Sequence, residues 1–91
     1  MKETTRDPYN TAVAAALDRI YVSKGSPLAQ VAEAVGISRM TVRRYLNGER
    51  DIRVVELRGF ADALGVTVAD ILHEADRSIQ QVTERDIETV G

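Results

Sequence analysis

The feature that most constrains this chain is the segment LAQVAEAVGISRMTVRRYLN, residues 28–47. Apolar residues recur at three- and four-residue spacing on both sides of Gly36, which predicts two short helices joined by a tight turn. Such a turn needs a residue that adopts positive φ without strain, and glycine does so. A small residue must lie where steeply crossing helices nearly touch, and Ala32 occupies that place. The segment therefore predicts a compact two-helix unit.

The second helix of this unit, about residues 39–46 with Ser38 as its N-cap, has two unlike sides. At about 100° per residue, Val42 and Tyr45 fall on an apolar arc. The opposite arc is basic and carries Arg39, Arg43 and Arg44. We expect the apolar arc to pack on the rest of the domain and the basic arc to face outward, where a DNA duplex could lie.

Helical spacing predicts three further helices, and no strand-like alternation persists anywhere. Asp7 and Ser26 each precede a proline and are expected to cap the first two helices of the chain. Thr67 and Asp70 form a capping-box pattern at the start of the fifth helix. The expected helices cover about residues 8–24, 27–35, 39–46, 53–64 and 68–76. The chain is therefore predicted to be all-α.

The fourth and fifth predicted helices leave two questions open. The fourth is expected to turn Val54, Leu57, Phe60, Ala61 and Leu64 inward. Gly59 in the same helix permits close approach of another helix, either locally or from a partner subunit. After residue 76 the apolar spacing continues weakly with Ile79 and Val82. We divide the chain into a DNA-binding domain, residues 1–76, and an extension, residues 77–91, that is either a dimerisation helix or a loose tail.

Length and composition limit what else the chain contains. Its 91 residues suit one domain with one modest core, and there is no cysteine for disulfides, thiolate zinc sites or thiol catalysis. The polar N-terminus lacks the apolar run of a signal peptide, and no segment approaches the roughly 18 apolar residues that span a membrane. We expect a cytoplasmic protein that needs no cofactor or small-molecule ligand and makes no membrane contact.

Charge is unevenly distributed along the chain. The net charge is −2, yet residues 38–58 carry six arginines against three acids, whereas residues 59–91 carry seven acids against two arginines. The basic middle could meet phosphate while the acidic end faces away. Asp70, His73 and Glu74 share helical spacing, but a solvated acidic face is far more common than a metal site in such a pattern.

The full pattern resembles the family of phage repressors, Cro proteins and XRE-type regulators. GISRMTVRRYLNGER is similar to that family's recognition helix and following loop, and LRGFADALGVTVADIL is similar to its fourth and fifth helices. The resemblance covers residues 26–72. It implies a compact five-helix, lambda-repressor-like domain with a helix-turn-helix, which binds double-stranded DNA at near-palindromic sites, commonly as a homodimer.

The resemblance and the layout of the basic arc together give a set of candidate DNA contacts. In the family, positions matching Arg39, Met40 and Arg44 reach base edges, and Arg43 lies beside them. The position matching Asn47 holds phosphate. The complete set of predicted phosphate contacts is Ser26, Gln30, Ser38, Thr41, Asn47, Arg50 and Arg53. The chain departs from the family at Leu28, where a polar glutamine is frequent, and at Pro27, which lacks an N–H.

Three functions are compatible with these patterns. The first is a transcriptional repressor or Cro-like protein that blocks polymerase by occupying an operator. The second is an antitoxin that binds a toxin protein through the acidic segment after residue 70 and binds DNA through residues 39–46. The third is a protein-interaction domain without a DNA role. An enzyme is not expected, because no constellation of catalytic residues is present.

Overall fold

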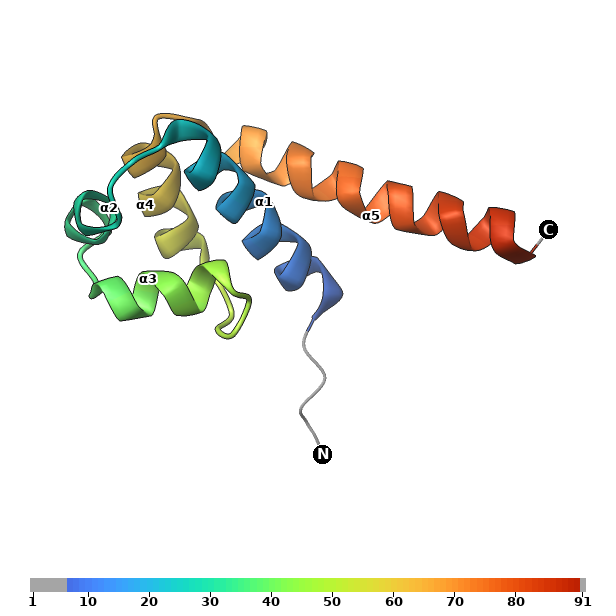
Figure 1. The fold of residues 1–91 in the computed structure, drawn as a ribbon, viewed down its shortest axis with the longest axis horizontal. Coiled ribbons are helices and arrows are strands. Elements are labelled where there is room, and N and C mark those ends of the chain that lie inside the picture. Colours follow the sequence, from blue (N-terminus) through green and yellow to red (C-terminus); the bar gives the residue numbers. More distant parts are fainter. Residues whose placement is uncertain (1–6, 91) are drawn as a thin grey trace.

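The computed structural model describes residues 7–90, and the side chains of residues 7–79. Within that range the chain forms five helices and no strand: α1 Pro8–Lys24, α2 Leu28–Val35, α3 Arg39–Leu46, α4 Val54–Leu64 and α5 Val68–Val90. The first four helices and the start of α5 form one compact body, from which α5 projects as a continuous rod (Figure 1). The all-α, five-helix prediction is confirmed. The helix α5 extends past residue 76 and ends at Val90.

Two of the predicted helix caps are present as hydrogen bonds. The Asp7 carboxylate accepts from the Tyr9 N–H at 2.9 Å at the start of α1. The Ser38 hydroxyl accepts from the Thr41 N–H at 3.1 Å at the start of α3. Each bond satisfies an N–H that has no partner within its own helix, so these side chains fix where α1 and α3 begin.

The predicted capping box at the start of α5 is confirmed. The Thr67 N–H donates to Asp70 Oδ2 at 3.1 Å, and the Asp70 N–H donates to Thr67 Oγ1 at 2.9 Å. The hydrogen bonds from the Thr67 backbone and side chain lower the pKa of the exposed Asp70 carboxyl. The reciprocal pair fixes the direction in which α5 leaves the α4–α5 turn.

The cap predicted for α2 is wrong. The helix begins at Leu28, and Pro27 rather than Ser26 is its N-cap, with no side-chain cap bond. Pro27 has φ −63° and ψ 139°, an extended conformation, so it lies outside the helix instead of in its first turn. Its carbonyl nevertheless accepts from the Gln30 and Val31 N–H groups at 3.1 and 3.2 Å.

One continuous apolar core joins all five helices. Phe60 of α4 is fully buried and meets the Tyr45 ring of α3 edge to face, with ring centroids 5.8 Å apart. The complete buried cluster is Val13, Ala16, Leu17, Val31, Ala32, Val42, Tyr45, Leu46, Leu57, Phe60, Ala61, Leu64, Ile71 and Ala75. Because each short helix contributes to this cluster, none depends on its intrinsic propensity alone.

Val54 departs from its predicted inward position. It was expected to lie with Leu57 and Leu64 on the apolar side of α4, and those two are buried, but Val54 is 79% exposed. Its neighbour Val55 is equally exposed. Val54 is the first residue of α4, so it extends past the end of the core, where helical phase alone does not provide a packing partner.

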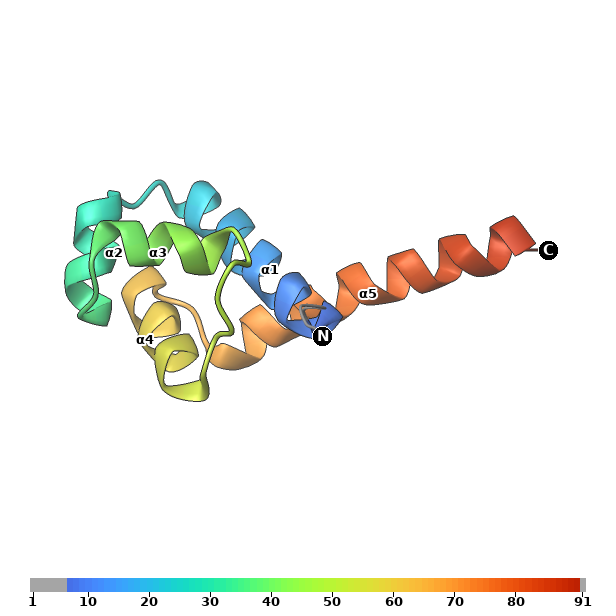
Figure 2. The ribbon, with the colours of Figure 1, turned by 90° about the horizontal axis from the view of Figure 1, so that it is seen from below.

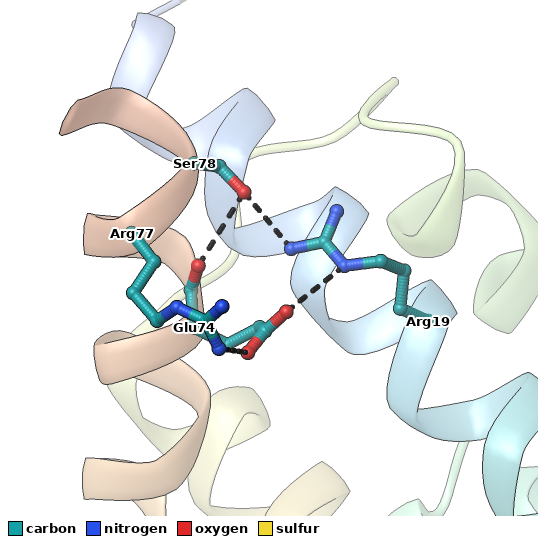
Figure 3. Close-up of polar contacts among 4 residues, drawn as sticks. All are labelled: Arg19, Glu74, Arg77 and Ser78. Atoms are coloured by element: carbon teal, nitrogen blue, oxygen red, sulfur yellow. Dashed lines mark hydrogen bonds and ion pairs between the residues drawn. The ribbon is translucent and has the colours of Figure 1, made fainter. Parts of the chain in front are cut away.

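Polar contacts attach α5 to α1. Arg19 reaches from α1 to α5, donating to Glu74 Oε2 at 3.2 Å and to Ser78 Oγ at 3.0 Å (Figure 3). Near the start of α1, the Tyr9 hydroxyl donates to Asp76 Oδ1 at 2.9 Å. The two α1 residues therefore contact the same two turns of α5, next to the buried Ala75. Among the described residues, no helix is long and apolar enough to span a bilayer.

Gly59 of α4 faces Val35 of α2. A Cβ at this position would lie 3.5 Å from Cγ1 of Val35, an ordinary van der Waals contact. Gly59→Ala should therefore be tolerated and should stabilise the domain by about 0.5–1 kcal/mol, because alanine is the better helix former. Urea unfolding followed by circular dichroism measures the change. Destabilisation by this variant would show that the packing of α4 against Val35 cannot accommodate an added methyl group.

Candidate nucleic-acid interface

The turn between α2 and α3 is closed by the backbone of one residue. The Ala32 carbonyl accepts from the Gly36 N–H at 2.8 Å and from the Ile37 N–H at 3.0 Å. Gly36 has φ 87°, the left-handed conformation that the sequence predicted for this position. Val31 and Ala32 are buried beneath the turn. The observed unit is therefore a helix-turn-helix formed by α2 and α3.

One side of α3 is buried and the other faces solvent. Val42, Tyr45 and Leu46 are at most 5% exposed and belong to the core. The opposite side presents Arg39, Arg43 and Arg44, which are all exposed, together with Met40, which is 64% exposed. The helix runs along the edge of the domain and is the one nearest the viewer when the molecule is seen from below (Figures 1 and 2). We call these four residues the basic face of α3.

The arginines of the basic face are available to an external partner. Within residues 7–79, the ion pairs of the domain involve Arg19, Arg53, Arg58 and Arg77, and none involves an arginine of the basic face. Arg44 lies with its Nη2 at 3.6 Å from the Met40 sulfur, a weak contact. A planar guanidinium with five donors and no carboxylate partner is suited to bidentate contact with a base edge or a phosphate.

The predicted phosphate contacts differ in how freely they are presented. Gln30 is exposed and Ser26 is half-buried near the start of α2. The Ser38 and Thr41 hydroxyls lie 2.9 Å apart and hydrogen-bond each other. Because each hydroxyl has one proton and two lone pairs, this bond leaves further hydrogen-bonding capacity on both oxygens. Ser38 and Thr41 lie at the first turn of α3, where unpaired backbone N–H groups also favour an anion.

The remaining phosphate candidates flank the end of α3. Asn47 donates to Glu49 at 3.3 Å. Arg53 donates from Nε and Nη2 to the two oxygens of Glu56, both at 3.3 Å, although its side chain is 81% exposed. The Glu56 side chain is only 16% exposed and also accepts the Arg53 N–H at 3.2 Å, so it belongs to the cap of α4, whereas the Arg53 guanidinium remains accessible to a phosphate.

The structure adds one residue that sequence patterns did not identify. The side-chain amide of Asn10 donates to the Arg50 carbonyl at 3.2 Å and accepts from the Ile52 N–H at 2.8 Å. The Arg50 guanidinium carbon lies 5.3 Å from the centre of the Tyr45 ring. The only sequence indication was an asparagine, a poor helix former, in the first turn of an otherwise favourable helix.

The acidic residues at the start of α5 are not arranged as a metal site. Asp70 caps the helix, and Glu74 pairs with Arg19 and Arg77 at 3.2 and 3.4 Å. In the part of the chain that the structure describes, no group of three histidine, cysteine, aspartate or glutamate side chains could hold a metal ion.

Comparison with known proteins gives a consistent result. The family model described as Helix-turn-helix matches residues 17–71. A solved structure of the clp gene regulator ClgR from Corynebacterium glutamicum is 30% identical, with a TM-score of 0.80 over 94% of this chain and 93% of that chain. A second structure of the same regulator is 32% identical, with a TM-score of 0.74 over 84% of this chain and 95% of that chain. No curated protein sequence matches the chain.

Proposed function

Because the chain belongs to the helix-turn-helix family of XRE-type, DNA-binding transcriptional regulators, we propose that it represses transcription by occupying a near-palindromic operator in the cytoplasm. The supporting observation is the division of α3 into a buried apolar side and a basic face whose arginines have no ion-pair partner within residues 7–79. A major groove is wide enough for one α-helix, and α3 is presented at the edge of the domain.

In the proposed complex, the basic face of α3 enters the major groove. Arg39 is the first residue of α3 and would enter deepest, donating two hydrogen bonds to guanine O6 and N7. Arg44 lies more than one turn further and would contact a second guanine or a phosphate, and Arg43 would contact either. Met40 has no hydrogen-bond donor and would pack on a thymine methyl group.

Phosphate contacts would fix the helix in the groove. Asn47, Arg50 and Arg53 lie at and after the end of α3, and Ser38 and Thr41 lie at its start. Ser26 and Gln30 would contact the strand beside α2. A duplex held at both ends of α3 and beside α2 has one orientation on the domain, which base contacts alone would not impose.

Selection of bound oligonucleotides from a random duplex pool tests this proposal. We expect the purified chain to enrich a sequence with two-fold symmetry, and its affinity to fall steeply with salt because phosphate contacts release counterions. Failure to bind any duplex at low salt would contradict it. The antitoxin alternative requires a bound toxin protein in addition, so co-purification of one partner at fixed stoichiometry would favour that function.

Arg39→Ala tests the base contact directly. Loss of a bidentate guanine contact should weaken binding to the selected site by about 1–3 kcal/mol and relax the preference at one base position per half-site. Arg58→Ala is the matched control, because it also removes one exposed arginine but lies on α4. The control should leave the base-preference matrix unchanged. An unaltered matrix for Arg39→Ala would show that this residue contacts only the backbone.

We further propose that the chain binds as a homodimer through the projecting part of α5. A near-palindromic operator places the α3 helices of two bound copies about 34 Å apart, which requires a fixed connection between the copies. The sequence continues its apolar spacing along α5 with Ile79, which is half-buried, and Val82, whose side chain lies outside the described residues. This rod is attached to the domain by Arg19 through Glu74 and Ser78.

Deletion of residues 80–91 should therefore give a monomer that still folds, because it leaves the Arg19 contacts in place. A monomer contacts only one half-site at a time, so its binding to the full operator should be weaker. Its affinity for an isolated half-site should stay unchanged. Analytical ultracentrifugation of the full and shortened chains measures the mass in solution. A full chain that is already monomeric, or a shortened chain that remains dimeric, would exclude this interface.

A further inference from the structure

We infer that Asn10 is a positioning residue for DNA binding, which holds the α3–α4 loop, residues 47–53, beside the basic face of α3. This inference rests on the proposed function, because it assigns a role to the loop that carries Arg50 and Arg53. Asn10 itself lies in the first turn of α1 and is not expected to touch DNA.

The contact between Asn10 and the loop uses both ends of one amide. Its Nδ2 donates to the Arg50 carbonyl at 3.2 Å, and its Oδ1 accepts from the Ile52 N–H at 2.8 Å. An amide provides a donor and an acceptor in one rigid plane, so the two bonds fix the loop in both position and orientation. A carboxylate can only accept, and a serine hydroxyl places its donor and its acceptor on a single atom, so neither would span both loop groups.

The loop backbone makes few other hydrogen bonds at this place, although the Ile52 side chain also packs against the core. The Glu49 N–H donates to the Arg44 carbonyl at 2.9 Å, which ends the regular bonding of α3. Arg53 then donates its N–H to Glu56 of α4 at 3.2 Å. Between these points, within residues 7–79, the hydrogen bonds made by the backbone of residues 50–52 both go to Asn10. Asn10 is therefore the principal polar support of the middle of the loop.

The supported segment controls where two candidate phosphate contacts lie. Arg50 has its guanidinium over the Tyr45 ring, and Tyr45 packs α3 onto the core. Arg53 is the N-cap of α4 and presents an 81% exposed side chain. If the bonds to Asn10 are lost, both arginines are carried by a less restrained backbone, and a phosphate contact then costs more conformational entropy.

Asn10→Ala tests this role in the full-length chain. Fluorescence anisotropy with the duplex selected by the wild-type protein should show binding about five- to tenfold weaker, with a slope of log K against log salt smaller in magnitude by about 1 to 2. The base-preference matrix should stay as in the wild type, because the basic face of α3 is untouched. Hydrogen exchange should show reduced protection of the Ile52 amide.

Two controls separate positioning from stability. Thr11→Ala alters the neighbouring exposed residue of α1 and should bind as the wild type does. Ile71→Val destabilises the core from α5 without touching the loop, so it should lower the melting temperature but keep the salt slope. Asn10→Ser removes the double contact by a different change and decides the matter if Asn10→Ala does not fold.

The outcomes distinguish this inference from the proposed function. A wild-type chain that binds duplex DNA while both Asn10 variants keep its affinity and salt slope would overturn the positioning role and leave the function intact. A wild-type chain that binds no duplex would overturn the function first. A reduced slope in the Asn10 variants, but not in Ile71→Val, would support the role assigned to Asn10.

Discussion

The burial of one side of α3 is the interaction on which the rest of the structure depends. An isolated helix of eight residues is not stable in water, so α3 exists because Val42, Tyr45 and Leu46 are removed from solvent by the other helices. The edge-to-face contact of Tyr45 with Phe60 joins it to α4. Since the buried side fixes the rotation of the helix about its own axis, it also fixes which residues face outward. The basic face is thus a consequence of core packing.

Within residues 7–79, the arginines of the basic face are not compensated by ion pairs. Arg19, Arg53 and Arg77, in contrast, each pair with a carboxylate of the domain. The basic face instead concentrates like charge on one short helix, which raises the local potential and is unfavourable for the free protein. A duplex bound as proposed would remove that repulsion. The seven acids of residues 59–91 follow the basic segment in the sequence, so they do not add to the positive charge of α3.

Local patterns in the sequence were sufficient for most of the fold, because they depend on residues close together in the chain. The caps at Asp7 and Ser38, the Thr67–Asp70 pair and the turn at Gly36 all involve partners within four residues, and each was predictable. The cap predicted at Ser26 was wrong because Pro27 is the last extended residue before α2 and not the first residue of the helix. A proline is compatible with both positions. Periodicity also predicted that Val54, in the first turn of α4, is buried, but it is exposed. Periodicity identifies one face of a helix, but not how far along the helix a packing partner extends.

The contacts that sequence patterns missed are those that join distant segments. Asn10 and the residues that it binds are 40 and 42 positions apart, and Tyr9 and Asp76 are 67 apart. No periodicity relates such pairs, so only the assembled fold reveals them. Their arrangement has a mechanical consequence, because the two adjacent residues of α1 hold different parts of the molecule. Tyr9 binds the rod formed by α5, and Asn10 binds the loop beside the basic face. The first turn of α1 therefore contacts both the rod and the loop, and this shared attachment could be recognised only in the assembled fold.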